Sequence, residues 1–193
     1  AGELTKFGFI AQLGNVIQYF NYRLSYFILN TYGGPADVGV YSVGVVLSEA
    51  VWLLSSSISL VLYSSVANKG ENFYSKQLTV KLAKWSFLLT FLSVTVLFSI
   101  PEKAFTFIFG KDFSHLKNVI FSLGTGVVCF GFSGILSHYF AGTGKYTINT
   151  AAASLGLIVT LVGNVLLVPK LGYLGAGMTA SLSYFVTALF LIL

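Results

Sequence analysis

The fold is decided by FGFIAQLGNVIQYFNYRLSYFILNT, residues 7–31, followed by YGGPAD, residues 32–37, and VGVYSVGVVLSEAVWLLSSSISLVLYSSV, residues 38–66. Each flanking stretch is longer than the ~20 apolar residues that a helix needs to cross a membrane. The glycines and the proline between them favour a tight turn. We therefore predict a transmembrane helical hairpin at the start of the chain.

The composition of the whole chain extends this prediction. Hydrophobic residues make up 55%, charged residues only 9%, and the mean hydropathy is +0.83, whereas soluble domains carry roughly 25% charged residues. Further helices are expected at about 83–101, 118–141, 146–168 and 174–193. Runs such as Gly156-Leu157-Ile158-Val159 lack the alternation of a membrane β-strand. The sequence predicts an all-α polytopic membrane protein, with residues 1–193 forming one transmembrane lobe of six helices.

The positive charges predict an orientation in the membrane. The net charge of +5 is too small to imply nucleic-acid binding. Between the second and third predicted helices, four lysines accompany one acid, and the first turn has neither lysine nor arginine: Lys69, Lys76, Lys81, Lys84 and Glu71. Cytoplasmic loops carry the excess of basic residues. Both ends of this segment are therefore expected in the cytoplasm, with the lysines near anionic lipid headgroups.

Two opposite charges, Arg23 and Glu49, lie inside the first two predicted spans. Counted from the turn, they are about 12 and 14 residues away, so both lie ~18–21 Å from it, near the midplane of the hydrocarbon core. Charged side chains at this depth are costly and usually functional. We expect them to be part of a functional site.

Polar residues accompany the two charges on one face of each helix. At 100° per residue, a narrow face of the first helix collects Gln12, Asn15, Tyr19, Tyr22, Arg23, Tyr26 and Asn30. The second helix places Trp52 on the same side as Glu49. These nine residues are predicted to line a polar cavity between the two helices. The alternative for the tyrosines is packing within the bundle.

Two interpretations of the charges stay open and are compatible. Arg23 and Glu49 form a static ion pair, since charges in membranes usually pair, or Arg23 binds an anionic group such as a phosphate or diphosphate, which its planar guanidinium fits. Glu49 is the only carboxylate deep in a predicted span. It is therefore the candidate for intramembrane proton coupling.

No constellation of residues indicates an enzyme. His138 has no second histidine or carboxylate three or four positions away, so metal binding is not predicted. Gly142-Thr143-Gly144-Lys145 lacks the preceding glycine and strand of a phosphate-binding loop. We predict no catalytic residues, no metal and no cofactor.

The last two helices carry small residues at four-residue spacing, which allows helices to approach closely in membranes. Ala152, Gly156 and Thr160 form such a face on the fifth helix, and Gly172, Ala176 and Ala180 form one on the sixth. We expect the two helices to pack tightly and to move as one rigid unit.

Several short motifs then occur in order along the chain: Asn21-Tyr22-Arg23-Leu24-Ser25, Val38-Gly39-Val40-Tyr41-Ser42-Val43, Glu49-Ala50-Val51-Trp52, Phe109-Gly110-Lys111-Asp112-Phe113, Gly142-Thr143-Gly144-Lys145, and Asn164 with Val168-Pro169-Lys170-Leu171-Gly172 and Gly175-Ala176. In order and spacing the chain resembles bacterial oligosaccharide flippases of the multidrug/oligosaccharidyl-lipid/polysaccharide exporter superfamily. The resemblance covers essentially the whole chain. It departs at Ser25, where many of those proteins carry an acid.

The resemblance implies a transporter of two six-helix lobes in the bacterial inner membrane, of which this chain is the second. The chain would then be a fragment whose N-terminal lobe is missing. Its expected partners are membrane lipids and a lipid-linked oligosaccharide, carried across the membrane by alternating access for O-antigen or other polysaccharide synthesis. Arg23 would hold the diphosphate, and the aromatic and amide side chains the sugars. A multidrug or small-cation antiporter and a non-transporting scaffold are the alternatives.

Overall fold

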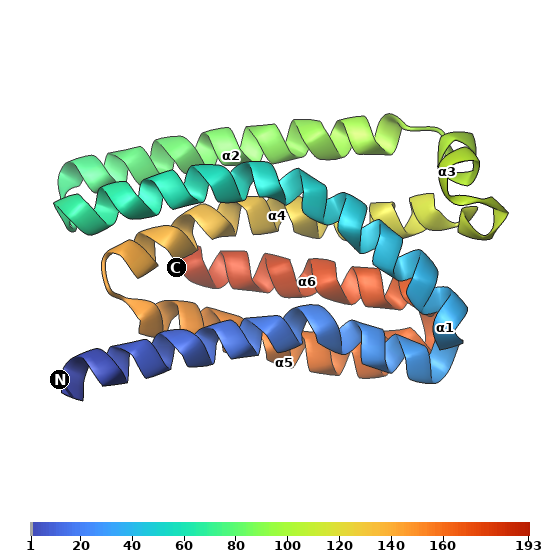
Figure 1. Cartoon of the computed structure of the whole chain (residues 1–193), viewed down its shortest axis with the longest axis horizontal. Helices are drawn as coiled ribbons and strands as arrows, with labels where there is room; N and C mark the ends of the chain where they lie inside the picture. Colours follow the sequence, from blue (N-terminus) through green and yellow to red (C-terminus); the bar gives the residue numbers. More distant parts are fainter. Residues whose placement is uncertain (1) are drawn as a thin grey trace.

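The chain folds into helices that run side by side along one direction (Figure 1). The computed structural model describes residues 2–193, with side chains from residue 8 onward; residue 1, the start of the predicted lobe, lies outside the described residues. The elements are α1 (Gly2–Lys69), α2 (Phe73–Ser99), α3 (Glu102–Phe109), the 3-10 turn η1 (Lys111–Phe113), α4 (Leu116–Gly142), α5 (Tyr146–Leu171) and α6 (Tyr173–Ile192). No strand occurs within residues 2–193, which confirms the predicted all-α class.

Helix α1 consists of two arms joined at a bend. An uninterrupted helix of 68 residues would be ~100 Å long, about three times the hydrocarbon core of a bilayer. The bend falls at Gly34, whose φ of 77° and ψ of −177° interrupt the helix, and Pro35 follows it. Only glycine adopts this backbone region readily. Both arms leave the bend toward the same end of the molecule (Figure 1), as predicted for a hairpin.

The bundle has two ends (Figure 1). The termini end holds the beginning of α1, the end of α6, the loop 70–72 and the turn 143–145, and the bend end holds Gly34, α3 and the junction of α5 with α6. Among the described residues, five helices are long and apolar enough to cross a membrane. Because the first of these is α1 with its two arms, the helices are consistent with the all-α polytopic membrane protein predicted from the sequence.

Helix α2 begins at Phe73, well before the predicted start at residue 83. Asn72 caps its first turn, because the side-chain Oδ1 of Asn72 accepts a hydrogen bond of 2.8 Å from the backbone N–H of Ser75. Lys76 and Lys81 therefore lie on a helix and not in a loop. A charge-poor stretch of sequence indicates the part of a helix that lies in lipid. Helix α2 begins before that part.

The short helix α3 lies in the predicted loop at the bend end. Phe105 of α3 is 3% exposed and packs with Leu116 and Ile120 of α4. Phe107, on the opposite face, is 89% exposed, and Ile108, at the edge of the buried face, is 68% exposed. One buried and one exposed apolar face are typical of a helix that lies in the interface of a membrane.

Helix α6 lies between α4 and α5, and the first arm of α1 runs along α5 (Figure 1). The approach of α5 to α6 depends on glycine. A Cβ on Gly156 would lie 2.7 Å from Thr187 Oγ1 and 2.8 Å from Asn21 Nδ2. The predicted small-residue face of the fifth helix therefore does meet the sixth helix, and it meets the first arm as well.

A buried polar network joins the first arm to α5 and α6. Thr160 of α5 and Ser183 of α6 both donate to Asn21 Oδ1 on the first arm. One turn further along, Asn164 Nδ2 donates to Ser25 Oγ at 3.0 Å. These side chains are at most 6% exposed. Hydrogen bonds between buried polar side chains are a common means of fixing helices against one another in membranes.

Candidate functional site

Arg23 is the only arginine of the chain and is exposed on the first arm of α1. Its guanidinium carbon lies 6.0 Å from the ring centre of Tyr19 and 5.6 Å from that of Tyr26. Aromatic faces attract cations at up to about this separation. Two rings, one turn before and one turn after the arginine, therefore flank a cation that remains accessible from outside the bundle.

Glu49 is exposed on the second arm. Among residues 8–193, every side-chain ion pair involves Glu71, so no direct contact joins Glu49 to Arg23. The static ion pair, one of the two interpretations of the sequence, is not formed in this structure. Both groups are exposed, and neither satisfies the other.

The first arm presents further polar side chains beside Arg23. Asn15 Nδ2 donates to Gln12 Oε1 at 3.5 Å, and both side chains are exposed. With Tyr19, which is 60% exposed, and Asn30, they form the polar stripe: Gln12, Asn15, Tyr19, Arg23 and Asn30. The stripe lies on the exterior of this chain and not in an enclosed space between the two arms. Tyr26 is half-buried beside it, with its ring 5.3 Å from the ring of buried Tyr41.

Tyr22 and Trp52 point into the bundle and not to its exposed face, unlike Arg23. Their rings are 6.1 Å apart and pack with Phe130 of α4 and Tyr184 of α6. The ring centres of Trp52 and Phe130 are 4.5 Å apart, and those of Phe130 and Tyr184 are 4.8 Å apart. We call these four residues the aromatic cluster. The sequence analysis did not single out Phe130 and Tyr184, because a phenylalanine or tyrosine within an apolar span does not by itself indicate a site.

The aromatic cluster separates two cavities. The larger one, the inner pocket, has a volume of about 360 Å³ and lies on the side of the termini end between both arms, α4, α5 and α6. Its polar lining includes Asn15, Gln18, Ser56, His138, Asn149 and Thr187. The smaller cavity of about 30 Å³ lies toward the bend end and is lined by Ser25 and Glu49. Both cavities touch Tyr22, Trp52 and Phe130.

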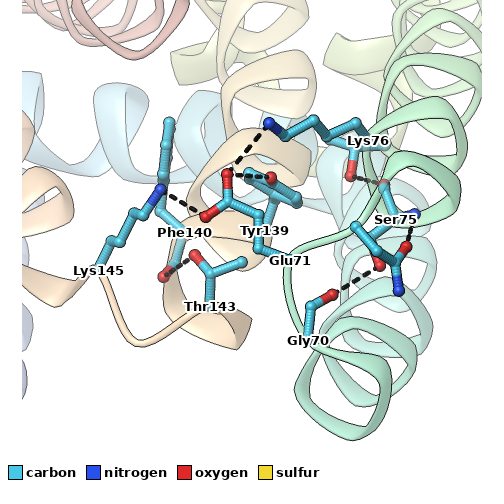
Figure 2. Close-up of polar contacts among 10 residues, drawn as sticks. Gly70, Glu71, Ser75, Lys76, Tyr139, Phe140, Thr143 and Lys145 are labelled. Carbon is cyan, nitrogen blue, oxygen red and sulfur yellow. Dashed lines mark hydrogen bonds and ion pairs between the residues drawn. The ribbon is translucent and has the colours of Figure 1, made fainter.

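The termini end carries a cluster of charges that the sequence did not predict (Figure 2). The carboxylate of Glu71 in loop 70–72 lies 2.7 Å from Lys145 Nζ and 3.3 Å from Lys76 Nζ. The Tyr139 hydroxyl donates to Glu71 at 3.4 Å. The hydrogen bond from Lys145, and to a lesser extent the one from Lys76, holds the pKa of the Glu71 carboxyl group below its usual range. Lys76 was expected only to contact lipid headgroups.

Metal ligands do not gather in the part of the chain whose side chains are described. No three histidine, cysteine, aspartate or glutamate side chains lie together there. His138 Nδ1 donates to the carbonyl of Gly134 at 2.8 Å. It is therefore a hydrogen-bonded residue of the inner pocket wall.

Fold and site together define a polytopic membrane protein with an exposed cationic stripe and a polar pocket inside its bundle. A sequence model of the family described as "Polysaccharide biosynthesis protein" matches residues 1–118. The chain therefore belongs to the polysaccharide biosynthesis protein family. This match covers both arms of α1, with Arg23 and Glu49, and extends into the start of α4.

Two curated proteins are similar to the chain. The capsular polysaccharide biosynthesis protein CapF of Staphylococcus aureus is 28% identical over 167 residues, which are 82% of this chain and 41% of CapF. An uncharacterized membrane protein of Methanocaldococcus jannaschii, MJ1068, is 28% identical over 138 residues, 69% of this chain and 27% of that protein. The chain thus spans less than half the length of either relative. No solved structure matches it.

Proposed function

We propose that the chain is one lobe of a transporter that carries lipid-diphosphate-linked oligosaccharide across the cytoplasmic membrane by alternating access. The observation that carries the proposal is Arg23, exposed between Tyr19 and Tyr26 on a helix long and apolar enough to cross a membrane. A guanidinium facing lipid at the centre of a span is costly. Its exposure supports a second part of the protein, or water and substrate, on this face.

The chemistry of the stripe suits a lipid-linked sugar. The planar guanidinium can bind two phosphate oxygens at once and stays charged at any cellular pH. The rings of Tyr19 and Tyr26 beside it can pack on the faces of sugars, and the amides of Gln12 and Asn15 can bond sugar hydroxyls. Membership of the polysaccharide biosynthesis family agrees with such a substrate. No enzymatic step is required of these residues.

The same exposure supports the proposal of a second lobe. CapF is more than twice as long as the part that matches this chain, which leaves room for another set of spans. A lobe that covered the polar stripe would create a cavity between the two halves with Arg23 and Glu49 in its wall. We assign Glu49 the role of a carboxylate that takes up and releases a proton during transport. The lysines near the termini end support a cytoplasmic location for that end.

The test is polysaccharide export in a flippase-deficient bacterium supplied with the full-length protein. Arg23→Ala is expected to abolish export, and Arg23→Lys to retain part of it, because lysine keeps the charge but loses the two-pronged geometry. Lys84→Ala, which removes an exposed cation on α2, is the matched control and should export normally. Normal export by Arg23→Ala would contradict the proposal. Drug resistance without polysaccharide export would instead support an antiporter.

A further inference from the structure

Inside the bundle, the wall of the inner pocket contains polar groups that nothing in the described part of the chain satisfies. Among residues 8–193, three buried atoms that line or adjoin this pocket have no hydrogen-bond partner: Trp52 Nε1, Asn149 Oδ1 and Thr187 Oγ1. Buried polar atoms are nearly always paired, and leaving one unpaired costs stability. Three such atoms from α1, α5 and α6 around one cavity indicate that the pocket takes a polar occupant.

The lining defines the chemistry of that occupant. The three atoms are a donor, an acceptor and a hydroxyl that can do either, so they match hydroxyl and amide groups. The lining contains no aspartate, glutamate, lysine or arginine, which disfavours an ion. The rings of Trp52 and Phe130 close one side, and aromatic rings offer apolar faces for packing. The volume of about 360 Å³ is that of a small-ligand site.

We propose that the inner pocket binds an uncharged sugar unit, as a second subsite within the lobe. The proposal rests on the proposed function, because the sugar belongs to the same lipid-linked substrate as the diphosphate. Asn15 connects the two places, since it belongs both to the polar stripe and to the pocket lining. It lies eight positions before Arg23, or ~12 Å along the helix. A substrate held by its diphosphate at Arg23 thus has its first sugars within reach of the pocket.

Helix α6 offers a matched pair of variants for the test. Thr187 and Thr179 each have a buried hydroxyl without a partner in the described chain, but only Thr187 lines the pocket. Thr187→Val and Thr179→Val make the same substitution with little change in shape. Trp52→Phe removes the indole donor and is a second, independent variant. Equilibrium dialysis of the full-length protein measures binding of two radiolabelled probes, neutral N,N′-diacetylchitobiose and undecaprenyl diphosphate.

Loss of one neutral hydrogen bond should weaken disaccharide binding roughly two- to tenfold in Thr187→Val and in Trp52→Phe. Thr179→Val should bind the disaccharide like the wild type, and all three variants should keep undecaprenyl diphosphate, which also shows that they are folded. The pocket proposal is overturned if the wild type does not bind the disaccharide. It is also overturned if Thr179→Val weakens disaccharide binding as much as Thr187→Val does. The occupant of the pocket would then be ordered water. The proposed function is tested separately, by polysaccharide export and by the binding of undecaprenyl diphosphate to Arg23→Ala.

Discussion

Glu71 Oε2 and Lys145 Nζ lie 2.7 Å apart and join the loop between α1 and α2 to the turn between α4 and α5. Their hydrogen bond lowers the pKa of Glu71 and raises the pKa of Lys145. The stabilisation from Glu71 is therefore present at neutral pH and lost as the pH falls through its lowered pKa. The stabilisation from Lys145 is lost as the pH rises through its raised pKa. The termini end is held together between these limits.

Removing the carboxylate should abolish this pH dependence on the acid side. In Glu71→Gln, we expect the amides in turn 143–145 to be less protected from hydrogen exchange at neutral pH, and this protection, measured relative to the intrinsic exchange rate at each pH, to change little on acidification. Because the groups are exposed, about 1 M salt should have a similar effect on the wild type. Glu102→Gln, an exposed acid at the bend end, is the control. Wild-type exchange in Glu71→Gln would show that the ion pair does not hold the turn.

Gly34 should not tolerate a side chain. Its φ of 77° and ψ of −177° lie in a region almost restricted to glycine, so Gly34→Ala should lower the free energy of unfolding by about 1–3 kcal/mol. Gly39 is five residues further along in a regular part of α1, and a Cβ there would meet no atom within 4 Å. Gly39→Ala should therefore raise stability by about 0.5–1 kcal/mol. Thermal unfolding in detergent micelles compares the two, and equal shifts would contradict the bend.

Asn164 should contribute strongly to stability. It is fully buried and donates to Ser25 Oγ and to the backbone carbonyl of Thr160. Asn164→Ala removes a donor and leaves buried acceptors behind, so it should cost about 1–3 kcal/mol of unfolding free energy. Asn30→Ala, an exposed asparagine on the same bundle, should stay within about 0.5 kcal/mol. The same micelle unfolding assay measures both, and a neutral Asn164→Ala would show that the network is dispensable.

Glu49 should determine the response of transport to a proton gradient. In vesicles containing the full-length protein, we expect an imposed pH gradient to accelerate transport by the wild type and to leave Glu49→Gln unaffected, because glutamine cannot take up a proton. Glu102→Gln keeps Glu49 and should respond like the wild type. If Glu49→Gln responded fully, another group would have to carry the proton.

The sequence predicted the all-α class and its long apolar helices, because the cost of placing charge in lipid leaves long charge-poor segments. It did not predict the true start of α2, where Asn72 caps a helix that still carries Lys76 and Lys81. It also missed α3, whose apolar residues are too few for a span. Capping and interfacial helices depend on local hydrogen bonds and on partners in three dimensions, which hydropathy does not encode.

The candidate site was predicted only in part. A helical projection grouped Tyr22 with Arg23, but the structure turns Tyr22 inward to the aromatic cluster and leaves Arg23 outside. A helical projection gives the direction of each side chain around the helix axis. It does not show which other helices pack against that side chain. Asn149 and Thr187 could not have been chosen either, because isolated polar residues in apolar helices become notable only once their hydrogen bonds are counted.

The bend at Gly34 has a mechanical consequence. It is the only covalent link between an arm that packs along α5 and an arm that packs beside α4 and α2. Each arm is more than thirty residues long, or ~50 Å. A hinge rotation of only about 5° at this glycine would swing the far tip of an arm by ~4 Å at that length. Small torsional changes at the bend end are thereby amplified into a wide displacement at the opposite mouth of the bundle.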